Sequence, residues 1–299
     1  MAIDKAVDSA LLDNALAATA EKIREKTGST EDIAFDMEKG TGFADAVEAI
    51  QAGTGGGDSD DVLVSIAENT LTELNSNAIT AINTQAFRTV HSMKRVVLPN
   101  CLKFIQDAFN GNKGIEEIEL ANYTGNADYG LHLFFSGNTA LKRAYMPSCR
   151  TIGNQMFANC TALTDIVVSD EIFRLGGNSL SKTAITEFVH PTVTHVYNDV
   201  FYGCPNLKKV DINNSGWYVE SALCRNASVL ETFIMRSTNF CRLGATTAFA
   251  GTPIESGKGY IYVPSALVEE YKAATNWSVY ADQIRAIEDY PEITGGVDE

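Results

Sequence analysis

The side chains that could carry out chemistry are few, and they are scattered along the chain. No serine, cysteine or acid is spaced from a histidine in the way a nucleophilic triad would suggest, and there is no glycine-rich phosphate motif. His190 occupies a repeat position that holds Leu, Met, Ile or Val elsewhere, so we interpret it as a hydrogen-bonded core histidine. We therefore expect no catalytic residue, no cofactor and no enzyme. The four histidines are His91, His132, His190 and His195.

The cysteines follow the phase of a repeat and show no metal-binding pattern. Cys160 and Cys204 each stand three residues after a phenylalanine, while Cys101 and Cys149 follow Leu-Pro-Asn and Met-Pro-Ser. There is no C-x-x-C pair and no Cys/His cluster with zinc-like spacing. We predict buried thiols in core positions rather than disulfides. The remaining two cysteines are Cys224 and Cys241.

The chain is acidic, with a formal net charge of −15 over 299 residues. An acidic surface repels phosphate backbones, so we expect no nucleic-acid partner. No stretch approaches the roughly 20 apolar residues of a membrane-spanning helix, so we expect no membrane insertion. The start, MAIDKAVDSALLDNALAATA, lacks a basic segment followed by an apolar run and does not predict a secretory signal peptide.

The first 61 residues divide into a helical head and a linker. Residues 1–50 carry a helical stripe of Leu12, Leu16, Ala20 and Ile23, and a second helix is expected over Phe43–Ile50. The stripe could pack on the second helix or on further copies of the chain, so the head is expected to serve in attachment or oligomerisation. Residues 51–61, QAGTGGGDSDD, form a flexible linker, and its aspartates lack the spacing of a calcium loop.

Residues 62–287 are built from a repeat. Each copy has an anchor (an aromatic residue or leucine), a turn with Asn, Gly or Cys, and then the pattern L-x-x-I-x-L. The anchors recur mostly every 21–23 residues, and twice after 26. Repeats of this length predict a solenoid. The anchors are Phe87, Phe109, Phe135, Phe157, Leu180, Phe201, Leu223 and Phe249.

The final apolar pair of each copy alternates as one face of a strand requires. Stacked coils would join these strands into one parallel sheet above a continuous core. The fold class is thus an α/β repeat solenoid, leucine-rich-repeat-like, with a parallel sheet on one face and a small N-terminal helical head. The inward pairs are Val96/Leu98, Ile118/Leu120, Ala144/Met146, Ile166/Val168, Phe188/His190, Val210/Ile212, Phe233/Met235 and Ile261/Val263.

The terminal coils need caps because they would otherwise expose core. Residues 62–77 are expected to cover one end. A helix over Pro264–Ala274 is expected at the other, and the next apolar residues, at helical spacing, can close the core. Residues 288–299 read as an acidic tail, disordered unless docked. The apolar residues after the helix are Trp277, Tyr280, Ile284 and Ile287.

The outward side chains of the sheet form two rows. The first row is mostly apolar or aromatic, and an exposed apolar strip of this size marks an interface unless it only reflects the strand preference of β-branched residues. We predict this row as the binding face: Val97, Glu119, Tyr145, Val167, Val189, Asp211, Ile234 and Tyr262. The first four members of the second row alternate in charge and can pair across strands. That row is Arg95, Glu117, Arg143, Asp165, Glu187, Lys209, Thr232 and Tyr260.

The coils QMFANCTALTDIVV and DVFYGCPNLKKVDI resemble the BspA-type bacterial leucine-rich repeat, and IYVPSALVEEYKAATNWSVYADQIRAI is similar to the last coil and cap of that family. The head segments AEKIREKTGSTEDIAF and GFADAVEAI resemble the start of many minor structural proteins of tailed phages. These resemblances imply surface or virion proteins that bind hosts or other proteins, with no catalytic residues to carry over. The repeat departs from the family pattern at Leu180, His190 and Leu223.

Three functions fit these features. The first is a non-enzymatic phage virion protein of the tail, baseplate or fibre, whose head binds other virion proteins and whose solenoid binds a host-surface glycan or protein, or another virion protein. The second is a purely structural decoration or assembly protein of the virion, and the third is a bacterial surface adhesin. A homo-oligomer is expected, because weak single sites gain avidity when they are linked. Localisation to the phage particle follows from the first two functions.

Overall fold

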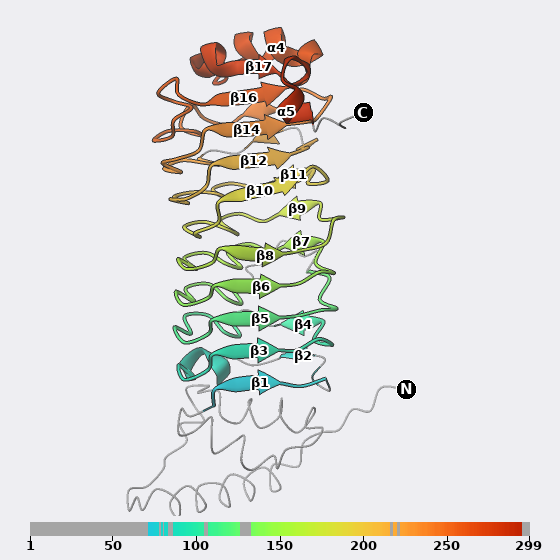
Figure 1. Ribbon diagram of the computed structural model, residues 1–299, viewed down its shortest axis with the longest axis vertical. Helices are drawn as coiled ribbons and strands as arrows, with labels where there is room; N and C mark the ends of the chain where they lie inside the picture. The colour runs from blue at the N-terminus through green and yellow to red at the C-terminus, as the bar shows by residue number, and fades with distance from the viewer. Residues whose placement is uncertain are drawn as a thin grey trace, which may run out of the picture.

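The computed structural model describes residues 71–294, except 78, 80, 83–85, 105–106, 126–132, 216–217 and 220–221. The predicted head (1–50), the linker (51–61), the start of the predicted cap and residues 295–299 lie outside the described residues. The described chain is a solenoid whose coils stack along one axis, with one short strand per coil on its front face (Figure 1). The predicted fold class is confirmed for this part of the chain.

The front face consists of two five-stranded parallel sheets rather than the single sheet predicted. β8 and β10 end these sheets and do not pair with each other. The first sheet contains β1 (Glu73–Asn75), β3 (Arg95–Val97), β5 (Glu117–Glu119), β6 (Arg143–Tyr145) and β8 (Asp165–Val167). The second contains β10 (Glu187–His190), β12 (Lys209–Ile212), β14 (Thr232–Met235), β16 (Tyr260–Val263) and β17 (Ile284–Ala286).

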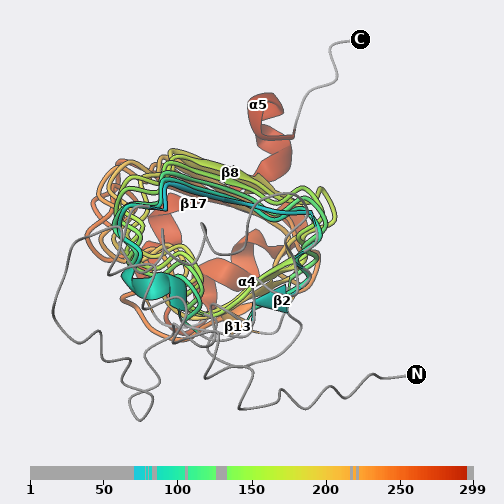
Figure 2. The ribbon, with the colours of Figure 1, turned by 90° about the horizontal axis from the view of Figure 1, so that it is seen from below.

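The back face carries shorter parallel ladders. In the view along the axis, the front strands lie in one layer and the back ladders lie across the core from them (Figure 2). The ladders pair β2 (Ala81–Ile82) with β4 (Lys103–Phe104), β7 (Thr151–Ile152) with β9 (Arg174–Leu175) and β11 (His195–Val196), and β13 (Tyr218–Val219) with β15 (Arg242–Leu243). A 3-10 helix, Ala86–Thr89, lies in the first described coil.

The anchors form the spine of the core. Phe87, Phe109, Phe135 and Phe157 stack ring on ring, with centroids 5.2, 5.3 and 5.9 Å apart. The residue two places after most anchors has a positive φ, between 57° at Lys182 and 75° at glycine, which explains the Asn and Gly of the repeat turn. All eight anchors are fully buried, including Leu180 and Leu223.

The predicted inward pairs are confirmed as core. All of these side chains are buried except Ile166 and His190, which are half-buried. Both exceptions lie beside the break between β8 and β10. The break interrupts the sheet, whereas the core continues past it as one cluster that includes Val168 and Phe188, with Ile166 packed against it.

The ends of the solenoid differ in part from the prediction. Within the expected cap 62–77, Glu73–Asn75 forms β1, the first strand of the sheet, paired with β3. The expected helix at Pro264–Ala274 is a 3-10 turn (Ser265–Leu267) followed by α4 (Val268–Ala273). Trp277, Tyr280 and Ile284 close the core as predicted.

The helical structure that the spacing after Trp277 predicted is wrong for part of this segment, because the edge of β16 needs a strand to pair with its backbone N–H and C=O groups. Ser278–Gln283 is a 3-10 helix, and the chain then pairs with β16 as β17. A 3-10 turn (Ile287–Asp289) and α5 (Pro291–Thr294) follow. Within the described residues, every helix is too short or too polar to cross a membrane.

The ring stack predicts the cost of removing one anchor. Phe109→Ala should lower the free energy of unfolding by about 3–5 kcal/mol, because the variant leaves a cavity between two rings. The measurement is urea denaturation followed by circular dichroism. Leu102→Ala, at a side chain that is 50% exposed, is the control and should change stability little. Equal losses in the two variants would contradict the role of the stack.

Candidate functional site

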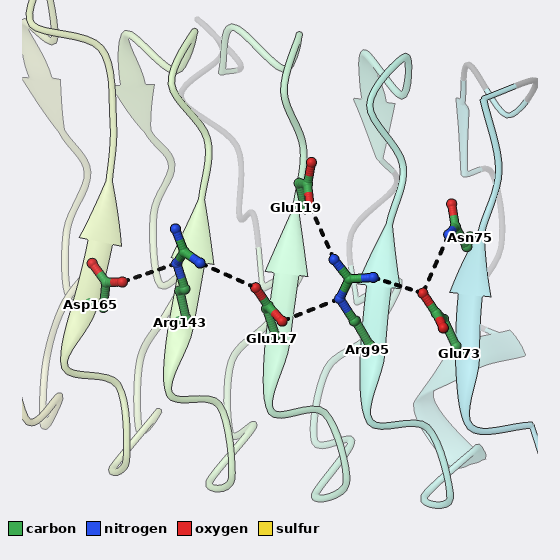
Figure 3. Close-up of polar contacts among 7 residues, drawn as sticks. All are labelled: Glu73, Asn75, Arg95, Glu117, Glu119, Arg143 and Asp165. Carbon is green, nitrogen blue, oxygen red and sulfur yellow. Dashed lines mark hydrogen bonds and ion pairs between the residues drawn. The ribbon is translucent and has the colours of Figure 1, made fainter.

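The front face of the first sheet carries a ladder of ion pairs (Figure 3). The Arg95 guanidinium lies 2.9 Å from the Glu73 carboxylate and 3.2 Å from that of Glu117. Arg143 lies 3.5 Å from Glu117 and 3.0 Å from Asp165. The predicted alternation of charge thus pairs neighbouring strands, and Glu73 of β1 extends it by one strand.

The ladder supports the register of the sheet rather than a reaction. The hydrogen bond with Glu73 raises the pKa of Arg95, with a smaller contribution from Glu117, so the guanidinium stays charged. A second, more exposed set places Glu116 between Lys94 and Lys142, and the hydrogen bond from Lys142 lowers the pKa of Glu116. Opposite charges on adjacent strands favour the pairing that brings them together.

The predicted apolar row is only partly available to a partner. Glu119, Tyr145 and Val167 are half-buried, and Val189 is 40% exposed. The Arg143 guanidinium lies over the Tyr145 ring, 5.4 Å from its centroid. Val97 is buried, contrary to the prediction. Arg95, two residues earlier on the same face of β3, extends across to the Glu119 carboxylate.

The far end of the predicted row is covered, and its exposure was predicted wrongly. Asp211, Ile234 and Tyr262 are 2%, 0% and 7% exposed. The chain that follows the cap returns over this part of the face, so that α5 lies outside the front layer (Figure 2). Ile287 and Ile293 form a small cluster with Ile234 and Tyr262, separate from the main core.

A buried ion pair fixes this cover. Arg236 Nε and Nη2 each donate to one oxygen of the Asp211 carboxylate at 2.7 Å, and Nη2 also donates to the Ile293 carbonyl at 2.8 Å. The Tyr290 ring meets the Tyr262 ring edge-on at 5.1 Å. The predicted acidic tail is therefore docked from residue 288 to residue 294, and the packed domain extends beyond the predicted boundary at 287.

The break between the sheets is a pocket of about 310 Å³. Ile166 of β8 and Phe188 of β10 lie among the residues that line it, together with His190. The His190 ring lies 4.7 Å from the Phe188 ring, and burial lowers its pKa, so the imidazole is neutral at pH 7. The expected core histidine is thus a half-buried pocket residue, packed against an aromatic ring.

Like charges accompany the break. Asp165 and Glu187 occupy the same position of consecutive coils, and both line the pocket. Elsewhere in the first sheet this position alternates in sign, and beyond the break Glu187 lies opposite Lys209. Two carboxylates placed directly opposite each other would repel, so pairing is least favourable at this step.

The sequence reasoning missed one shared role. The residue three places after an anchor donates a hydrogen bond to a carbonyl of an anchor. Cys160 donates to Phe135 at 3.0 Å and Cys204 to Leu180 at 3.1 Å. Asn112 and Asn138 likewise donate to the anchor of the preceding coil, whereas Thr183 and Thr252 donate to the anchor of their own coil. The signal was present in the alignment of the coils, where this position holds only small polar residues or cysteine in those copies.

The cysteines are confirmed as buried free thiols. Burial raises the pKa of Cys101, Cys149, Cys160 and Cys241 to about 12. No group of three or more His, Cys, Asp or Glu side chains in the described part of the chain is arranged to hold a metal. The reactive chemistry of thiolates is therefore suppressed at these positions.

This architecture is that of a leucine-rich-repeat-like solenoid. A family model for the BspA type leucine rich repeat region matches six copies, over residues 67–148 and 132–255. The chain belongs to the BspA-type leucine-rich-repeat family.

Two solved structures are similar to the chain. One is a leucine rich cell surface protein from Faecalibacterium prausnitzii A2-165, at 11% identity over 71% of this chain and 67% of that one, with a TM-score of 0.39. The other is a leucine-rich repeat protein from Bacteroides ovatus ATCC 8483, at 12% identity over 72% of this chain and 92% of that one, with a TM-score of 0.20. No curated protein matches the chain.

The raised thiol pKa values predict slow labelling. At pH 8 a thiol with a pKa of about 12 is ionised to roughly one part in 10⁴. The native protein should react slowly with 5,5′-dithiobis(2-nitrobenzoic acid) at pH 8, and all six thiols should react once guanidinium unfolds it. Rapid labelling of the native protein would show that the thiols are accessible.

The Arg236–Asp211 pair predicts a large loss on removal of one partner. Arg236→Ala should destabilise the fold by about 3 kcal/mol, because it leaves the Asp211 carboxylate buried and unpaired. The double variant with Asp211→Ala should recover part of that loss. Lys272→Ala breaks an exposed pair with Glu269 and should cost under about 1 kcal/mol. Denaturation curves of the four proteins test these differences.

Proposed function

We propose that the chain is a non-enzymatic binding protein whose solenoid contacts a partner through the uncovered part of its front face. In this proposal the protein is a component of a phage particle (tail, baseplate or fibre), and the head attaches it to other virion proteins. The partner of the solenoid is a host-surface glycan or protein, or another virion protein. Several copies act together, so weak single contacts add up.

The observation that supports the binding role is the difference in exposure along the predicted row of the front face. Its far end is covered by α5, while Tyr145, Val167 and Val189 keep apolar surface accessible beside the ion-pair ladder. Apolar surface with a charged rim is typical of a protein interface. The virion role is supported by the resemblance of the head to phage structural proteins.

A second candidate is a bacterial surface adhesin, and membership in the BspA-type repeat family supports it. A third is an assembly or decoration protein of the virion that binds no receptor. The three differ in where the protein is found and in whether the front face binds cells.

The first experiment locates the protein. Particles are induced from the source bacterium with mitomycin C, purified on a density gradient and analysed by mass spectrometry beside the washed cell envelope. The virion proposal expects the protein in the particle fraction, at a constant ratio to the capsid protein. Recovery only from the envelope would replace it with the adhesin.

The second experiment tests the face. The full-length protein, fluorescently labelled, should bind host cells, and Tyr145→Ala/Val167→Ala should reduce binding at least fivefold by removing apolar contact area. The control, Leu102→Ala/Val279→Ala, changes two side chains that are 50% and 57% exposed away from this strip, and it should bind normally. Equal binding by both double variants would contradict the assignment of the face. No binding by the unaltered protein would leave the assembly role as the better account.

A further inference from the structure

The break in the front sheet leaves two strand edges facing each other without a partner. In a parallel sheet, the backbone N–H and C=O groups of one residue point to one neighbouring strand, and those of the next residue point to the strand on the other side. The Asp165 amide donates to the Lys142 carbonyl in the preceding coil, at 3.1 Å, so the polar groups of Ile166 face the break. On the other side the Thr186 carbonyl accepts from Lys208 at 2.8 Å, so those of Glu187 also face the break.

The coils remain joined on both sides of this opening. The Ala184 amide donates to the Leu163 carbonyl at 2.9 Å before the strands, and Thr194 donates to Phe173 at 2.9 Å after them. The separation is therefore confined to the strands, which Figure 1 shows set wider apart than the other neighbouring strands of the front face. The space between them is the pocket of about 310 Å³.

The charges on the front face alternate in sign from strand to strand, except that Asp165 and Glu187 on consecutive strands are both negative. Along consecutive strands the signs are negative at Glu73, positive at Arg95, negative at Glu117, positive at Arg143 and negative at Asp165. The next strand is again negative, at Glu187, and Lys209 opposite it is positive. Glu187 forms no ion pair with any described residue. A single positive charge between the two acids would restore the pattern.

We propose that this break binds an extended segment of a partner polypeptide that carries a lysine or arginine. The segment lies between β8 and β10 and exchanges backbone hydrogen bonds with both edges, as in β-strand addition. Its basic side chain points outward between Asp165 and Glu187. Ile166, Phe188 and His190 line the slot together with Thr164 and Thr186.

The proposal deepens the proposed function and rests on it, because it names the chemistry of a partner at the same face. Its test uses synthetic peptides and no cells. Two random nonapeptide libraries, with a central lysine or a central glutamate, are selected by mRNA display on the immobilised full-length protein. The lysine library should yield binders, and the glutamate library should yield at least tenfold fewer. Equal enrichment, or none, would overturn the proposal.

Hydrogen–deuterium exchange of the selected complexes locates the bound peptide. Protection should appear in fragments that contain Ile166 and Val189, and fragments around β6, already paired on both sides, should not change. Protection elsewhere would overturn the proposal. The same result without peptide, together with dimerisation in analytical ultracentrifugation, would assign the slot to a second copy of the chain and would overturn it too.

Two variants separate the charge from the backbone contribution. Glu187→Gln should weaken binding of the lysine peptides at least threefold, measured by fluorescence anisotropy. The matched control, Glu231→Gln, removes another exposed acid outside the slot and should leave binding unchanged. Val189→Pro removes a donor that faces the slot and not β12, so it should abolish binding while the thermal midpoint changes little.

Peptide binding that survives Glu187→Gln and Val189→Pro unchanged would place the site elsewhere. If the peptides bind as expected but the labelled protein does not bind cells, the slot stands and the receptor role fails. If cell binding depends on Tyr145 and no peptide is selected, the face stands and the slot fails.

Discussion

The contact of each coil with the next is the interaction on which the rest of the molecule depends. No single coil has enough apolar surface to form a core, and its front strand of three or four residues finds its hydrogen-bond partners only in its neighbours. The stacked rings of Phe87, Phe109, Phe135 and Phe157 and the side chains that reach from one coil to the next anchor make the same contact repeatedly. Anything that weakens one step therefore acts locally, at that step of the stack.

The inward half of the fold could be predicted from the sequence because it is periodic. The repeat places an apolar pair in each strand and a small donor three residues after many anchors, so burial follows from position alone, as at Cys160 and Cys204. The outward half could be predicted only in part. Strand alternation alone predicts that Asp211, Ile234 and Tyr262 are exposed. They are buried because the segment after the repeat packs on Ile234 and Tyr262 and bonds to Arg236, the ion-pair partner of Asp211.

The break in the sheet shows a different limit of the repeat pattern. Asp165 and Glu187 stood next to each other in the predicted row, and their equal charge was visible, but the pattern assumes that every step of the stack is the same. The step between β8 and β10 is unlike the others because the coils bond at its two ends and not along the strands. The break falls at the step where two carboxylates would oppose each other, whereas a periodic interpretation treats this step as one more strand pair.

These differences divide the front face into regions that differ in how much unpaired surface they offer to a partner. In the first sheet the polar groups satisfy each other through the ladder, and surface ion pairs of this kind hold register without demanding a ligand. At the far end α5 has already taken the place that a partner would occupy. Among the residues that the structure describes, unpaired strand edges, apolar side chains and an unneutralised carboxylate coincide around β8 and β10. In our proposal, the irregular step between β8 and β10, rather than the regular steps of the repeat, is what distinguishes one partner from another.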